Sequence, residues 1–304
     1  MIAKIWTIKK NSLFEPVKGP HKLCYSFLVM RVVEAPVVDI ESFPNHNFVI
    51  TVKEDELHDR CVPGQFVMAA ASIPDGLPHP LLKRALAIYK FGEGIGGAGT
   101  TSFLLKVVGE GTRLLSTMKP GERMSLIGPL GNGFDLTKAA RRISFLVVGG
   151  TGIASVYLLA EHLVRYGEEV HLVYGGRTEK DLVGLADFKR LGLPILVATE
   201  DGSKGYHGLV TDGFKDYLNR FPVDKTNIYT CGPNPMMQVI SKFAQFHSIP
   251  CQISVESKMG CGFGVCLGCT VMTRKSHKLA CTDGPVFDAY EFVWEGSVEL
   301  ATPG

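Results

Sequence analysis

Hydrophobic positions in the first half of the chain fall into short segments that turn residues separate. Apolar, strand-like segments begin near positions 27, 48, 66, 86, 103 and 124. Pro63-Gly64, Pro120-Gly121 and Gly131-Asn132-Gly133 supply turn signals between them. Many short strands at this spacing are typical of antiparallel β-structure. The pattern predicts an antiparallel β-barrel or sandwich over residues 24–140.

Longer apolar runs begin after residue 142 and alternate with helical patterns. The runs are continuous, as expected of strands that are buried on both faces of a sheet. Strands are predicted at 143–148, 170–174, 195–199 and 227–230, and helices at 153–166 and 236–246. This alternation predicts a doubly wound, parallel α/β domain over residues 141–252. It leaves an N-terminal extension at 1–23 and a small third module at 253–304.

Composition excludes several classes of protein. Hydrophobic residues make up 45% and charged residues 20% of the 304 positions, which is ordinary for a soluble globular chain. The formal charge of +2 provides no basic field for nucleic acid. Lysines interrupt the N-terminal stretch where a signal peptide needs an apolar core, and no apolar run is long enough to span a bilayer. We therefore expect a cytoplasmic protein with no nucleic-acid or membrane partner.

Four of the eight cysteines crowd into one short stretch near the C-terminal end: Cys261, Cys266, Cys269 and Cys281. Their spacing is C-x4-C-x2-C with a fourth cysteine twelve positions on, which is the plant-type pattern of a [2Fe–2S] cluster. Glycines at 260, 262, 264 and 268 allow the backbone to close around such a cluster. A structural zinc site and unligated thiols are the alternatives, but zinc sites usually pair two cysteines with a second close pair. The spacing favours iron and sulfide.

A glycine turn follows the first predicted strand of the α/β domain. Gly150, Gly152 and Ser155 form a G-x-G-x-x-S pattern, which is close to the dinucleotide fingerprint. Such a turn brings a pyrophosphate to a helix N-terminus, although simple helix–strand packing is the alternative. The acidic residue expected about 20 positions on is missing, and Arg177 lies there instead, so NAD and NADP both stay open.

A second motif, Cys231-Gly232-Pro233, joins a predicted strand to a predicted helix. In a doubly wound sheet this position lies at the carboxyl edge, where ligands bind. Cys231 is either a packed core thiol or a residue that lies against a nicotinamide ring.

Six motifs occur in the order found in the ferredoxin–NADP reductase superfamily. They are Arg84-Ala-Leu-Ala-Ile, Gly109-Glu-Gly-Thr-Arg-Leu-Leu-Ser, Gly128-Pro-Leu-Gly-Asn-Gly-Phe, Gly149-Gly-Thr-Gly, Cys231-Gly-Pro-Asn-Pro-Met and the cysteine quartet. Within this superfamily the chain most resembles the electron-transfer subunits of type B dihydroorotate dehydrogenases, over about residues 25–290. The order of the nicotinamide and cluster segments, and the ending Cys281-Thr-Asp-Gly-Pro-Val-Phe, make the resemblance specific.

The resemblance implies that the barrel holds FAD and that the α/β domain receives NAD(H). Arg84 matches the arginine that pairs with the FAD pyrophosphate, a role that suits a rigid guanidinium. Ala87 replaces the serine that faces the flavin N5 in the family, and Ser155 stands where many relatives carry proline. The insertion at 92–99 lies outside the resemblance. Candidate FAD residues are Arg84, Ala85, Leu86, Ala87, Leu104, Leu105, Lys106, Gly111 and Thr112, and candidate NAD(H) residues are Gly150, Thr151, Gly152, Cys231, Gly232 and Pro233.

The three cofactors form a chemically sensible set. NADH delivers a hydride and a cluster accepts single electrons, so a flavin must stand between them, and no side chain need act as acid, base or nucleophile. The resemblance implies a hetero-oligomer, a heterotetramer, with a flavin-containing catalytic subunit that oxidises dihydroorotate in pyrimidine biosynthesis. The alternative is the small subunit of an NADH-dependent ferredoxin:NADP oxidoreductase or a related hydrogenase or bifurcating complex, some of which use aspartate where Cys261 stands. A zinc-containing nucleotide-binding regulator is a third hypothesis.

Overall fold

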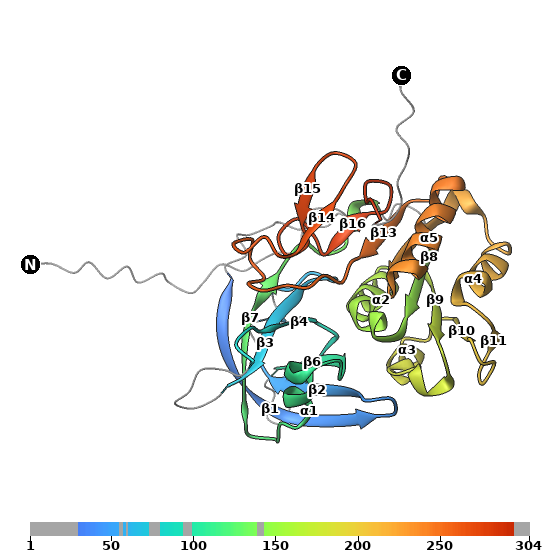
Figure 1. Ribbon diagram of the computed structural model, residues 1–304. Helices are drawn as coiled ribbons and strands as arrows, with labels where there is room; N and C mark the ends of the chain where they lie inside the picture. Colours follow the sequence, from blue (N-terminus) through green and yellow to red (C-terminus); the bar gives the residue numbers. More distant parts are fainter. Residues whose placement is uncertain are drawn as a thin grey trace, which may run out of the picture.

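The protein is described here by a computed structural model, which covers residues 30–54, 57–58, 60–72, 80–93, 99–138 and 143–294. The start of the first predicted strand and the tip of the insertion at 92–99 lie outside these ranges. Two sheets lie side by side, and the C-terminal segment, drawn in red, packs beside both of them (Figure 1).

The N-terminal sheet has seven strands in the order β4-β3-β7-β1-β2-β6-β5, and all its pairs are antiparallel. Its strands are β1 (Arg31–Phe43), β2 (Asn47–Lys53), β3 (Phe66–Ala71), β4 (Arg84–Ala87), β5 (Lys90–Glu93), β6 (Gly99–Lys106) and β7 (Arg123–Leu130). The edge strands β4 and β5 are separated only by Ile88 and Tyr89. Ile88 N–H donates to Gln65 O (3.3 Å), and Tyr89 N–H donates to Ser102 O (3.0 Å). One continuous segment therefore joins both edges, which gives the sheet its barrel-like form.

The second sheet has the order β11-β10-β9-β8-β12-β13-β16, and it is parallel except for β16. Its strands are β8 (Ile143–Gly149), β9 (Glu169–Gly176), β10 (Ile195–Thr199), β11 (Tyr206–His207), β12 (Thr226–Cys231), β13 (Cys251–Ser254) and β16 (Val286–Asp288). Every residue of β8 is buried, including those at its two ends, because helices cover the sheet on both sides. The predicted doubly wound α/β fold is confirmed.

The helices match the predicted pattern in part. They are α1 (Glu110–Ser116), α2 (Tyr157–Arg165), α3 (Leu185–Arg190), α4 (Val210–Leu218) and α5 (Asn234–Phe246), with short 3₁₀ helices η1 (Leu136–Lys138), η2 (Gly150–Val156), η3 (Glu179–Asp181) and η4 (Val223–Lys225). The helix predicted at 153–166 begins as η2 and continues as α2, and the helix predicted at 236–246 is α5. Helices α1, α3 and α4 were not predicted from the sequence.

The C-terminal segment is tied to both sheets. A small hairpin of β14 (Thr270–Met272) and β15 (His277–Leu279) follows the cysteine loop, and β16 then pairs antiparallel with β13. β13 spans residue 252, where the boundary between the α/β domain and the C-terminal module was predicted. That boundary stays a prediction. One hydrophobic core runs from Phe103 of the barrel through Tyr89 to Tyr157 and Phe188 of the α/β domain. No helix in the described ranges is long and apolar enough to cross a membrane.

Candidate functional site

A cavity of about 650 Å³ lies where the barrel, the glycine turn and the C-terminal segment meet. The predicted FAD residues of β4 and β6 form one wall, and the glycine turn and the segment after β13 form the others. The residues that line the cavity are Gly64, Phe66, Lys83, Arg84, Ala85, Leu86, Ala87, Leu104, Leu105, Lys106, Val108, Thr112, Thr151, Ala154, Ser155, Ser254, Val255, Glu256, Ser257, Lys258, Met259 and Pro285. Of the predicted NAD(H) residues, Thr151 lines the same cavity as the predicted FAD residues, whereas Gly150, Gly152, Cys231, Gly232 and Pro233 are not part of its lining.

Cationic side chains dominate the charged part of this wall. Lys83, Arg84, Lys106 and Lys258 line the cavity, against the single carboxylate of Glu256. Burial lowers the pKa of Lys83, an effect that the nearby Glu34 opposes. Lys83 Nζ also donates to Ser125 O (3.2 Å). A cavity with several cations and an apolar remainder fits a dinucleotide, whose pyrophosphate is anionic and whose flavin ring is flat and largely apolar.

Arg84 is held in place by its own backbone and by α1. Its Nη1 donates to Leu82 O (2.5 Å) and, more weakly, to Lys83 O (3.4 Å). A Cβ atom added at Gly111 would lie 2.3 Å from Arg84 Nε, so the guanidinium packs directly on this glycine. Gly111 therefore leaves the space that Arg84 occupies, rather than lining the cavity itself.

Thr112 lines the cavity at the start of α1, but its hydroxyl is already engaged. Thr112 Oγ1 accepts from Val108 N–H (2.9 Å) and Gly109 N–H (3.2 Å), and it donates to Gly109 O (3.0 Å). The threonine thus fixes the turn between β6 and α1. Its contact with a pyrophosphate stays a prediction.

The glycine turn combines an open position with a closely packed one. Gly150 has φ +53°, a region that favours glycine, and a Cβ there would meet nothing within 4 Å. A Cβ at Gly152 would lie 2.4 Å from Cys231 O, so this glycine packs η2 against the end of β12. Gly150 is therefore accessible to a ligand, whereas Gly152 sets the approach of helix and strand, as in dinucleotide-binding turns.

Cys231 lies behind the cavity wall and does not line it. Its side chain is fully buried, and Gly232 and Pro233 next to it pack against Gly149. Burial raises the pKa of the Cys231 thiol to about 12, with Glu256 adding to the shift and hydrogen bonds from Ser155 and Ser254 opposing it. The thiol is neutral at physiological pH, and its contact with a nicotinamide ring stays a prediction.

The cavity residues at the end of β13 were not predicted from the sequence. Ser254 and Glu256 line the cavity, and desolvation raises the pKa of the Glu256 carboxyl. Ser254 is the last residue of β13 and Glu256 lies two positions after it, so both are at the carboxyl end of a parallel strand, where ligands bind in open α/β sheets. That rule could have found them if β13 had been recognised as a strand.

The cysteine quartet lies in the loop before β14 and at the turn after β15. Cys266 is exposed and Cys261 half-buried, whereas Cys269 and Cys281 are buried. Backbone amides face the sulfurs: Gly264 N–H donates to Cys281 Sγ (3.2 Å) and Cys266 N–H to Cys261 Sγ (3.5 Å). These amide donors and the four thiols fit a [2Fe–2S] cluster, whose potential depends on hydrogen bonds to sulfur.

The thiols are grouped as two neighbouring pairs. Cys261 lies beside Cys266, and Cys269 lies beside Cys281. Burial raises the pKa of Cys261, but the backbone amides of Cys266, Phe263 and Val265 outweigh it, and the pKa falls to about 6. In the described ranges no three His, Cys, Asp or Glu side chains form a site for one metal ion.

The cysteine loop packs on the barrel next to the cavity. A Cβ added at Gly262 would lie 2.3 Å from Met68 Cγ, so the loop backbone touches β3. Phe66 and Met68 share a hydrophobic cluster with Cys269 and Cys281. Phe66 also lines the cavity, so a single side chain touches both the predicted flavin site and the core around the cluster ligands.

Models of two protein families match this chain. Residues 256–293 match the iron–sulfur cluster binding domain of dihydroorotate dehydrogenase B, and residues 146–242 match the oxidoreductase NAD-binding domain. The first match confirms the iron–sulfur interpretation of the quartet over the zinc alternative at the level of the domain. The second confirms a nicotinamide-type α/β domain.

Relatives and solved structures agree with these matches. The electron transfer subunit of dihydroorotate dehydrogenase B from Desulforamulus reducens is 32% identical over 87% of this chain and 99% of its own length. The corresponding subunit from a Geobacillus species is 37% identical over 87% of this chain and its full length. The structure of an NADH-dependent reduced ferredoxin-NADP oxidoreductase has a TM-score of 0.73 at 29% identity, covering 86% of this chain and 90% of that chain. A ferredoxin NADP+ reductase from Neisseria gonorrhoeae with bound FAD and NADP shares the fold, with a TM-score of 0.58 at 15% identity over 71% of this chain and 91% of its own. The chain belongs to the family of electron transfer subunits of dihydroorotate dehydrogenase B.

Proposed function

We propose that this chain passes electrons between a flavin-containing catalytic subunit and NAD(H), by way of a [2Fe–2S] cluster and FAD. In this proposal the partner oxidises dihydroorotate, and NAD+ is reduced, in the cytoplasmic synthesis of pyrimidines. The observation that carries the proposal is the shared wall at Phe66, which touches both the cavity and the core around Cys269 and Cys281. When bound, FAD supplies the exchange between hydride and single electrons, and the cluster supplies single-electron transfer.

In the barrel the chain's own residues would bind and orient the flavin. Arg84, seated on Gly111, would bind the pyrophosphate with its rigid fork, and Lys83 and Lys106 add positive charge. Ala87 presents a methyl group where the family has a serine, so no hydroxyl from β4 reaches the flavin edge. Thr151 and Ser155 of η2 and Ser254 of β13 place hydroxyl groups in the cavity wall from the α/β domain.

The cysteine loop offers a surface suited to the catalytic partner. Phe263, Val265 and Leu267 are 40%, 74% and 61% exposed around the exposed Cys266. Large apolar side chains gathered at a surface are typical of protein interfaces. We propose that the catalytic subunit docks here, which would bring its flavin close to the cluster within a hetero-oligomer.

The first expected result is the cofactor content of the purified protein. We expect about one FAD, two irons and two acid-labile sulfides per chain, because four cysteine side chains at cluster spacing and the cationic cavity are both present. Visible absorption, acid-released flavin and metal analysis measure this directly. Stoichiometric zinc without iron would contradict the proposal.

The second expected result is a preference for NADH over NADPH. Glu200 and Asp201 N–H donate to Gly176 O and Arg177 O (both 3.1 Å), so two acidic residues lie beside the end of β9. Similar electron transfer subunits are named as belonging to NAD(+)-dependent dihydroorotate dehydrogenases, and we expect kcat/KM to favour NADH by about tenfold or more, against the pull of Arg177 on a 2′-phosphate. Steady-state diaphorase assays with both nucleotides decide this.

A clear advantage for NADPH would favour the second candidate function. That candidate is the small subunit of an NADH-dependent ferredoxin:NADP oxidoreductase, which the likeness to the solved structure at TM-score 0.73 supports. Arg177→Ala is the diagnostic variant, because it should lower activity with NADPH only if Arg177 binds the 2′-phosphate.

A further inference from the structure

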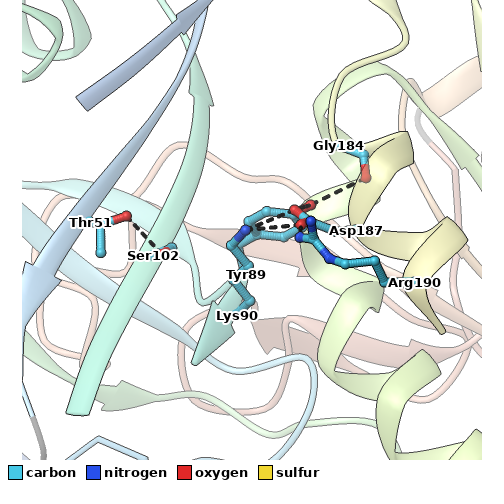
Figure 2. A network of polar contacts seen from close by, with 7 residues as sticks. All are labelled: Thr51, Tyr89, Lys90, Ser102, Gly184, Asp187 and Arg190. Atoms are coloured by element: carbon cyan, nitrogen blue, oxygen red, sulfur yellow. Dashed lines mark hydrogen bonds and ion pairs between the residues drawn. The ribbon is translucent and has the colours of Figure 1, made fainter. Parts of the chain in front are cut away.

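A polar network joins the barrel to helix α3 of the α/β domain (Figure 2). Tyr89 Oη donates to Asp187 Oδ2 (2.5 Å), and Lys90 Nζ lies 3.0 Å and 2.9 Å from the two carboxylate oxygens. Arg190, one turn along α3, also binds Asp187. We call Tyr89, Lys90, Asp187 and Arg190 the Asp187 network.

The carboxylate at the centre of the Asp187 network is buried, with 7% of the residue exposed. A buried charge is stable only when it is paired and hydrogen-bonded, and Asp187 receives donors from both domains. Burial and the neighbouring Tyr157 and Tyr174 raise the pKa of Tyr89, so its hydroxyl stays protonated and donates. Losing either the charge or the hydroxyl would leave the remaining groups poorly satisfied.

The barrel side of the network is an extension of the predicted flavin site. Residues 84–87 line the cavity, and Tyr89 and Lys90 follow them on the same segment. A second contact has the same arrangement: Lys106 lines the cavity and lies 3.8 Å from Asp181, which also accepts from Asn45 Nδ2 (2.8 Å). The segment after β4 therefore contacts Asp187, and the last residue of β6, Lys106, contacts Asp181.

The other side of residues 181–187 is tied to the glycine turn. The buried Tyr174 hydroxyl lies 3.1 Å from Gly150 O, 3.1 Å from Asp181 O and 3.2 Å from Val183 O. Gly150 is the open glycine of the predicted nicotinamide site. Residues 181–187 thus contact both the segment that lines the flavin cavity and a tyrosine that binds the nicotinamide turn.

We propose that Asp187, with Tyr89 as its partner, is a positioning residue for hydride transfer: the network sets the distance at which a nicotinamide held by the α/β domain meets a flavin in the barrel. The proposal rests on the proposed function, because it assumes FAD in the cavity and NAD(H) at the glycine turn. Hydride transfer needs reacting atoms within ~3–3.5 Å, and a misplacement of ~1 Å can cost on the order of 100-fold in rate. Domains in one chain move relative to each other unless their interface holds them.

The test compares Asp187→Asn and Tyr89→Phe with the parent in the full-length, cofactor-loaded protein. Asp187→Asn keeps the shape of the side chain and removes its charge, and Tyr89→Phe removes only the hydroxyl. We expect the rate of flavin reduction by saturating NADH, measured per bound FAD by anaerobic stopped flow, to fall about tenfold or more in each. FAD content and the flavin midpoint potential should stay at parent values, since neither residue lines the cavity.

Asp212→Asn is the matched control. It removes an aspartate that pairs with a lysine at 3.2 Å, but both residues lie on α4 within one domain. This variant should reduce its flavin at the parent rate. The double variant Asp187→Asn/Tyr89→Phe should be no slower than the slower single variant, because both changes break one interaction.

Three results would overturn the proposal. They are parent-like flavin reduction in the FAD-replete single variants, additive losses in the double variant, and a changed flavin potential that accounts for the slower rate. If Asp187→Asn does not fold, the milder Tyr89→Phe decides alone. A parent protein that binds FAD but is not reduced by NADH would instead refute the proposed function, and this proposal would fail with it.

Discussion

Replacing Cys266 with serine is expected to abolish electron exchange with the partner subunit, while NADH oxidation by a two-electron dye continues within about twofold of the parent rate. Serine is a poor iron ligand because its hydroxyl is far less acidic than a thiol. Cys266 is exposed, and serine is smaller than cysteine, so the loop has room for the change. The core shared by the barrel and the α/β domain, and the second core of the α/β domain, contain none of the four cysteines of the quartet, and the dye reaction needs only these two domains.

The controls separate loss of the cluster from loss of the fold. FAD content must stay at the parent level, since a misfolded chain would lose both activities. Cys61→Ser is the matched variant: Cys61 lies outside the quartet, and its Sγ donates to Val62 O (3.3 Å), a bond that serine can also make. This variant should keep its iron and both activities. A FAD-replete Cys266→Ser protein without iron that still exchanges electrons at the parent rate would show that the cluster is not the conduit.

The parts of the fold that could be predicted are those with a local pattern. β8 is buried throughout, so its sequence is a continuous apolar run, and α5 is long enough to show a helical period. Helix α3 has only six residues, too few to show a period, and β16 has three, whose pairing with β13 depends on the rest of the fold. The closure of the barrel through Ile88 and Tyr89 depends on pairing between distant strands and has no local signal.

The same distinction applies to the site. The cysteine quartet was found because cluster ligands share one loop, so their spacing is visible in the sequence. Asp187 had no such signal, since its partner Tyr89 lies 98 positions away and its burial exists only after the two domains have packed. Cys231 is the opposite case. Its motif is clear in the sequence, but its side chain is buried and does not line the cavity.

Replacing Arg84 with alanine is expected to weaken FAD binding by about 10- to 100-fold. A charge-assisted hydrogen bond contributes ~1.5–3 kcal/mol, and ~1.4 kcal/mol corresponds to a tenfold change in Kd. Arg84→Lys should fall between the parent and alanine, because it keeps the charge and loses the bidentate fork. Ultrafiltration of the reconstituted protein, with flavin fluorescence as the readout, measures the Kd. Arg113→Ala is the matched control, since Arg113 pairs with Glu110 at 2.6 Å on the exposed side of α1 and does not line the cavity.

Gly111→Ala tests the same site without removing a charge. The added methyl group would lie 2.3 Å from Arg84 Nε, so the guanidinium must move from its position on α1. If the orientation of the fork matters, FAD should bind more weakly than in the parent but more tightly than in Arg84→Ala. If only the positive charge matters, Gly111→Ala should bind FAD as the parent does. An Arg84→Ala protein with the parent Kd would move the pyrophosphate to the other cations of the wall, Lys83, Lys106 and Lys258.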